Sequence, residues 1–154
     1  MNTRPDKNAV SSHRPDWHDE GGHVAVWLTS EDGEKRVLRL DREDADFIRK
    51  VSGDGQFLTL VKQGHYGEKA VVLRSPALHV PQTTDADQGI SAGHLLTGEH
   101  VKGRYLHFIN QDHNDLCRSN LQWDWPDRNP RYEPIDWTLA EKQRQAFLAD
   151  GGSQ

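Results

Sequence analysis

The segment from residue 106 to residue 123 reads Leu106-His-Phe-Ile-Asn-Gln-Asp-His-Asn-Asp-Leu-Cys-Arg-Ser-Asn-Leu-Gln-Trp123, and it constrains the structure more than any other part of the chain. Apolar residues near its ends predict short strands at 104–109 and 121–123. Between them, Asn and Asp predict a loop, because these side chains hydrogen-bond nearby backbone groups. We therefore expect two strands joined by a polar loop, which the Asn120 side chain would fix.

This segment resembles the core of the HNH homing-type endonucleases. A common sequence of that family reads His/Asp-His-Ile-Asn-Gly-Asp-x-x-Asp-Asn-Arg-x-Ser-Asn-Leu-x-Trp. The matching positions here are Asn110, Asp112, Asp115, Arg118, Ser119, Asn120, Leu121 and Trp123. Each match alone also fits a plain structural role, such as a hydrogen-bonded core histidine at His107. Together they imply an HNH-like ββα-metal unit over residues 93–132 and an origin in a phage or mobile element.

The resemblance also implies roles in phosphodiester hydrolysis, which needs a divalent ion and a general base. His107 and Asn129, which stands nine residues after the motif Asn, would hold Mg²⁺, with water and phosphate oxygens at its other positions. Family members place the base, a His, where this chain has Phe108, and an aromatic ring cannot accept a proton. Losing a base typically lowers the rate by about 10²- to 10⁴-fold. The candidate catalytic residues are His107, Asn120, His113 and His94, of which the last two are substitute imidazoles outside the motif positions.

Other positions also depart from the family. Leu116 and Cys117 stand where a family Asn and Arg are usual, so we expect the hydrogen bonding of the loop to be altered. In the helix that we expect at 92–98, the family His and Arg positions fall on Gly93 and His94.

The residues before the motif predict a small sheet platform over 23–75, because apolar residues alternate in short runs around one amphipathic segment. The segment 38–47 is similar to the strand and acidic helix that precede the motif in HNH proteins related to plant AP2-type modules. Asp41 is placed to cap the helix. The expected elements are strands at 23–29 and 36–40, a helix at 41–50 and a hairpin with strands at 56–62 and 69–74.

The remaining segments complete a single domain, 23–154. Residues 1–22 are polar and rich in Pro and Gly, so we expect a flexible leader, and 76–92 predicts a long surface loop. Pro130 disfavours a helical conformation at Asn129, so the metal-bearing helix should be only about one turn long. A capping-box pattern, Thr138 to Glu141, predicts a C-terminal helix over 138–150.

Charge and composition restrict the choice of partner. The 154-residue chain has a net charge of -5. Residues 101–132 carry five Lys or Arg against four Asp, so we expect only modest affinity for nucleic acid. No apolar run approaches the about 18 to 20 residues that span a bilayer, and the first residues lack a signal core. With Cys117 as the single cysteine, no intramolecular disulfide is possible, and we expect a cytoplasmic protein.

Two functions remain open on this α+β fold. In the first, which we favour, the chain is a catalytically weakened or inactive HNH-like protein that binds a protein partner or nucleic acid. Trp125, Tyr132 and Trp137 would then form a partner-binding surface, although aromatic residues near prolines also commonly pack on a core. In the second, the chain is an active Mg²⁺-dependent endonuclease that cleaves DNA.

Overall fold

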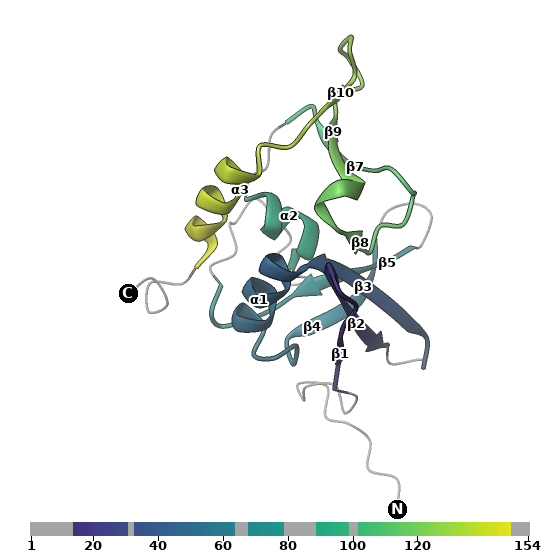
Figure 1. Ribbon diagram of the computed structural model, residues 1–154, viewed down its shortest axis with the longest axis vertical. Helices are drawn as coiled ribbons and strands as arrows, with labels where there is room; N and C mark the ends of the chain where they lie inside the picture. The colour runs from purple at the N-terminus through teal and green to yellow at the C-terminus, as the bar shows by residue number, and fades with distance from the viewer. Residues whose placement is uncertain (1–13, 31–32, 64–67, 79–88, 99–101, 149–154) are drawn as a thin grey trace, which may run out of the picture.

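The computed structural model describes residues 14–30, 33–63, 68–78, 89–98 and 102–148 (Figure 1). Three small sheets and a few short helices make up an α+β fold, as the sequence predicts. The strand orders are β1-β2-β3-β8, β4-β5-β6 and β10-β9-β7, and every pairing is antiparallel except that of β3 with β8.

The platform predicted over 23–75 is divided between two sheets, and the first sheet with its helix contains the first part of it. Its elements are β1 (Asp16–Asp19), β2 (His23–Thr29), β3 (Lys35–Asp41), α1 (Arg42–Val51) and β8 (Asp115–Leu116). The prediction that order begins at His23 is wrong, because β1 pairs with β2 and Trp17 of β1 donates a hydrogen bond to the Asp54 carbonyl at 3.2 Å. Residues 1–13 of the expected leader lie outside the described part of the chain, as do residues 31–32 between the expected strands at 23–29 and 36–40.

Helix α1 buries one face because its apolar residues recur at helical spacing. Ala45, Ile48 and Val51 lie in the core, and the chain turns away at Gly53, whose φ of +61° suits a residue without a side chain. Asp41 is the residue before the helix, as expected, but its side chain does not cap it. Its carboxylate instead accepts a hydrogen bond from the Arg118 backbone amide.

The second sheet contains the predicted hairpin, β4 (Leu58–Gln63) and β5 (Glu68–Leu73), followed by β6 (Ile90–Ser91) and α2 (Ala92–Thr97). Residues 64–67 of the predicted turn and 79–88 of the predicted loop lie outside the described residues. The last residues of that expected loop are ordered, since Ile90 is buried and pairs with Leu73.

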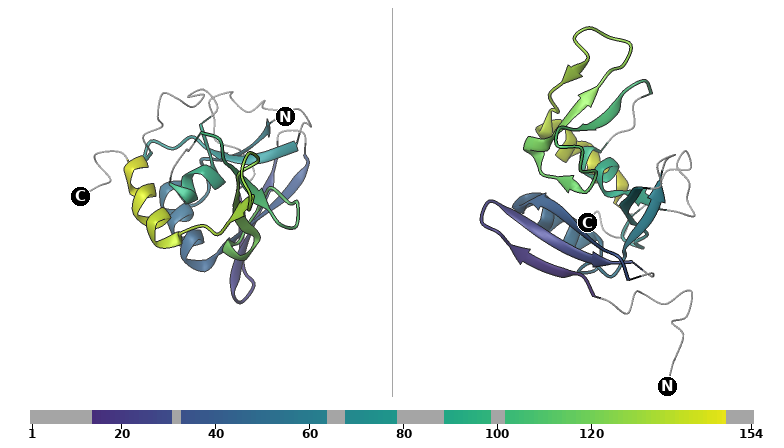
Figure 2. Two further views of the ribbon diagram at one scale, coloured as in Figure 1. Left: turned by 90° about the horizontal axis from the view of Figure 1, so that it is seen from above. Right: turned by 90° about the vertical axis from the view of Figure 1, so that its right-hand side faces the viewer.

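The third sheet follows the expected strands and then departs from the ββα pattern. Its strands are β7 (Tyr105–Phe108), β9 (Leu121–Asp124) and β10 (Tyr132–Glu133), and the 3-10 helix η1 (Arg118–Asn120) directly precedes β9. The prediction of a short helix at Asn129 is wrong. The chain instead turns there and returns as β10, closed by a hydrogen bond from the Trp125 amide to the Arg131 carbonyl at 2.7 Å. This hairpin projects from the rest of the molecule (Figure 2).

The C-terminal helix begins close to its predicted position, as α3 (Trp137–Gln143) continued by the 3-10 helix η2 (Arg144–Phe147). The predicted capping box is wrong, because the Asp136 side chain caps α3 by accepting from the Leu139 amide at 3.1 Å. One core cluster joins the three sheets and the helices. Among the described residues, no helix is both long enough and apolar enough to cross a membrane.

Candidate functional site

The polar loop between β7 and η1 is held by Asn120, which is buried. Its Oδ1 accepts from the Asn110 amide at 2.8 Å, and its Nδ2 donates to the Asp115 carbonyl at 2.9 Å. A buried amide that satisfies both of its polar atoms within one loop fixes the shape of that loop. Asn120 therefore positions the motif segment, as the sequence predicts.

The hydrogen bonding of the loop remains extensive despite Leu116 and Cys117. Asn110 donates to the Asp115 carboxylate at 2.8 Å, and that carboxylate also accepts from the Cys117 amide at 3.2 Å. Leu116 is buried and belongs to β8, so an apolar residue suits its position. Gln111 has a φ of +65°, a left-handed conformation that favours glycine, and the family sequence has Gly at this position.

Cys117 is not arranged as a nucleophile. Burial, and then its hydrogen bond and charge repulsion with Asp115, raise the pKa of the thiol to about 12. The thiolate is the reactive form, so this shift disfavours reaction of Cys117 at neutral pH.

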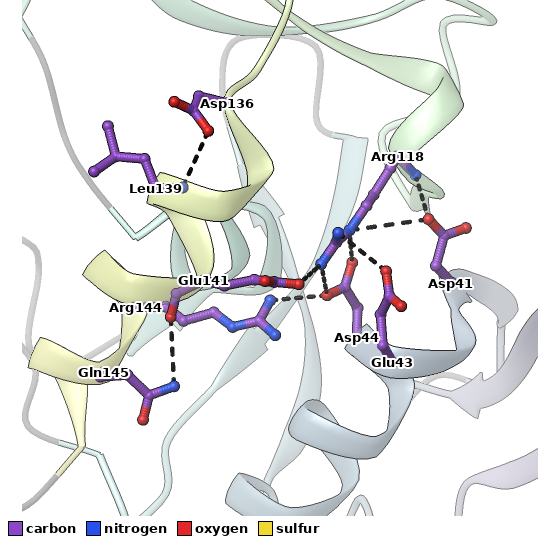
Figure 3. A network of polar contacts seen from close by, with 9 residues as sticks. All are labelled: Asp41, Glu43, Asp44, Arg118, Asp136, Leu139, Glu141, Arg144 and Gln145. Atoms are coloured by element: carbon purple, nitrogen blue, oxygen red, sulfur yellow. Dashed lines mark hydrogen bonds and ion pairs between the residues drawn. The ribbon is translucent and has the colours of Figure 1, made fainter.

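A buried ionic network ties the motif segment to the platform and to the C-terminal helix (Figure 3). Asp44 of α1 is 0% exposed and accepts from Arg118 Nε and Nη2 at 2.9 and 2.8 Å. It also accepts from Arg144 Nη1 at 2.8 Å, and Glu141 accepts from Arg118 Nη2 at 2.7 Å. The hydrogen bond to Asp44, and to a smaller extent the one to Glu141, raise the pKa of Arg118, so its guanidinium stays charged.

The network is a structural feature that the sequence analysis missed. Arg118 also lies over the Trp137 ring, 4.7 Å from its centroid, and Trp137 is half-buried against the core. Trp137, predicted to bind a partner, therefore packs within the fold.

His107 and Asn129, the predicted metal ligands, lie in surroundings that do not fit Mg²⁺. The His107 ring is stacked on Tyr132 with ring centroids 4.6 Å apart, and Asn129 lies in the exposed turn between β9 and β10. The neighbouring carboxylate, Asp124, accepts two hydrogen bonds from the Arg131 guanidinium. This hydrogen bonding, and then the positive charge of Arg131, lower the pKa of Asp124. Mg²⁺ prefers oxygen ligands, and in the described part of the chain no three His, Cys, Asp or Glu side chains are grouped to hold a metal.

Phe108 and the two substitute imidazoles line one cavity of about 400 Å³. His113 lies against Phe108, with ring centroids 4.8 Å apart, and His94 meets Phe147 edge-on at 5.5 Å. Side chains alternate along a strand, so His107, the neighbour of Phe108 in β7, points to the opposite face of the sheet. The structure thus brings His94 and His113 together with Phe108 and separates them from His107.

Helix α2 packs closely on a side chain of β7 at the position of the family His. A Cβ atom added at Gly93, which occupies that position, would lie 2.9 Å from Leu106 Cδ2. A larger side chain there would require at least the Leu106 side chain to shift.

The predicted aromatic surface is only partly exposed. Trp125 is half-buried against the core, lies under Arg128 at 3.6 Å and donates to Glu133 at 2.6 Å. Tyr132 is 44% exposed.

The sequence analysis did not identify two exposed side chains of this region, Tyr105, which is 63% exposed, and Ile109, which is 54% exposed. By strand alternation Tyr105 lies on the same side of the third sheet as His107 and Tyr132, and Ile109 follows the last residue of β7. We call this surface the β7–β9–β10 face, defined by Tyr105, His107, Ile109 and Tyr132. Their alternation with Leu106 and Phe108 was the sequence signal that could have identified it.

Comparison with known proteins found no matching family model, no matching curated protein and no matching solved structure. Any functional assignment therefore depends on the residues of this chain and on their geometry.

Proposed function

We propose that the chain is a degenerate HNH-like protein that binds a protein partner through the β7–β9–β10 face instead of hydrolysing phosphodiesters. The observation that carries the proposal is that the motif loop is well held while its general-base position is occupied by a phenylalanine. The loop is held by the hydrogen bonds of Asn120, while the position of the general base holds Phe108, packed in a cavity against His113. A scaffold retained without its base suits binding better than catalysis.

The composition of the face favours a protein over a nucleic acid. Exposed apolar and aromatic side chains gathered on one surface are typical of protein interaction sites. The charges beside them, Asp124 and Arg131, neutralise each other. The chain has a net charge of -5, so it has no overall excess of cations to attract phosphate backbones.

The test is quantitative binding by matched variants. A partner captured by cross-linking to the wild-type protein in its native host would be purified and titrated against the wild type and against the double variant Ile109→Ala/Tyr132→Ala. Truncating an anchor residue typically costs about 2 kcal/mol or more of binding energy, which is roughly a 30-fold rise in Kd. Leu139→Ala, an exposed leucine on α3, is the matched control and should leave Kd unchanged.

A double variant that binds the partner as tightly as the wild type would refute the proposal. Thermal melts of the same variants would show whether a loss of binding reflects unfolding. The wild type and the double variant are also titrated with a single-stranded oligonucleotide. Saturable binding by the wild type that is lost in the double variant would assign the face to nucleic acid instead.

A further inference from the structure

We propose that the cavity beside Phe108 is a binding site for a small uncharged molecule that contains an aromatic ring. This inference does not rest on the proposed function.

The cavity has the volume of a small-ligand site and extends from the surface to the core. Its volume is about 400 Å³, within the range of about 300 to 1,000 Å³ that such sites have. Tyr105, which is 63% exposed, lines it together with Val71 and Ala92, which are 2% and 1% exposed. A small molecule can therefore enter beside Tyr105 and become buried against the core.

The walls of the cavity are largely apolar. Leu106, Leu116 and Val71 contribute aliphatic surface, and Phe108 contributes an aromatic ring. A ring compound that binds here gains free energy from apolar burial and from offset or edge-on contact with the Phe108 ring.

The hydroxyl groups in the lining already have partners within helix α2. Ser91 Oγ caps the helix by accepting from the His94 amide at 3.2 Å. Thr97 Oγ1 donates to the Gly93 carbonyl at 3.0 Å. Because the helix itself satisfies these hydroxyls, an apolar ligand can cover them without leaving them unpaired.

The ionisable side chains in the lining are also held by the protein. The Arg104 guanidinium lies 3.8 Å from the centroid of the Trp123 ring, and the His113 ring lies 4.8 Å from that of Phe108. Both residues, and His94, have further interactions within the protein. The described lining includes neither Asp nor Glu. An ion in the cavity would have to give up its hydration and compete with these internal contacts, whereas an uncharged ligand would not.

The experiment is a titration of the full chain, followed by amide chemical shifts, with two probes that share one ring system. They are the uncharged naphthalene-1-methanol and the anion naphthalene-1-carboxylate. We expect saturable shifts centred on Val71, Gly93 and Leu106 with the uncharged probe. The carboxylate should bind at least tenfold more weakly, because its charge would have to enter an apolar cavity.

Variants test the location of the site. Ala70→Leu enlarges a side chain of the cavity lining and should weaken binding of the uncharged probe at least tenfold. Ala146→Leu is the matched control, the same substitution at an exposed position of η2 outside the lining, and should leave binding unchanged. If Ala70→Leu fails to fold, Phe108→Leu replaces it, and the loss of the aromatic wall should weaken binding measurably.

The proposal is overturned if the uncharged probe gives no saturable shifts at these residues. It is also overturned if the carboxylate binds as tightly as the uncharged probe or more tightly, or if the folded cavity variants bind the uncharged probe as the wild type does.

Discussion

Replacing Asp44 with Ala tests the ionic network that joins the platform, the motif segment and the C-terminal helix. The carboxylate is fully buried and accepts three hydrogen bonds of 2.8 to 2.9 Å from two guanidinium groups. Its removal takes the paired carboxylate from Arg144, whose side chain is only 7% exposed, whereas Arg118 keeps its ion pairs with Glu141 and Glu43. Breaking a buried ion pair by removing one partner costs about 3 to 5 kcal/mol, because the remaining charge is uncompensated.

Urea denaturation followed by circular dichroism measures this loss as a lower midpoint. Asp46→Ala is the matched control, since Asp46 is exposed on the same helix, and surface substitutions of this kind usually change stability by less than about 0.5 kcal/mol. If Asp44→Ala were as stable as Asp46→Ala, the network would not hold the fold together and the reasoning would be refuted.

Two further predictions concern titrating groups. Cys117, whose thiol pKa is raised to about 12, should react with iodoacetamide at pH 7.5 much more slowly than the same cysteine in the urea-unfolded chain, and equal rates would contradict its burial. The carboxyl of Asp124 should titrate below its ordinary pKa in a ¹³C NMR experiment, because Arg131 binds the charged form. Since a lowered folded-state pKa stabilises the fold above the ordinary value, this contribution should disappear as the pH falls through the lowered pKa. Arg131→Gln should raise the Asp124 pKa, and an unchanged value would show that the ion pair is not the cause.

Local patterns in the sequence predicted the features that depend on near neighbours. The strands β2, β3, β7 and β9, helix α1 and the loop fixed by Asn120 are set by alternation, helical spacing and Asn or Asp bonding to adjacent backbone.

Features that depend on distant residues were missed. Trp17 is ordered by contacts with Asp54 and Arg49, which a polar, glycine-flanked segment does not reveal. Asp44 meets its partners 74 and 100 residues further along the chain, a pairing for which a single sequence gives no signal.

The structure around Asn129 was predicted only in part. Pro130 disfavours a helix there, as expected, but the ion pair of Arg131 with Asp124 lies across a hairpin that the proline alone does not predict.

The measurement that most directly tests the central claim is a nicking assay on supercoiled plasmid and on circular single-stranded DNA. Wild-type protein and His107→Ala, purified identically, would be incubated with Mg²⁺ and, as a control, with EDTA. We expect no Mg²⁺-dependent cleavage above the EDTA control for either protein, because Phe108 cannot accept a proton and His107 is stacked on Tyr132. Mg²⁺-dependent nicking by the wild type that disappears in His107→Ala would contradict a binding role and establish the chain as an active endonuclease.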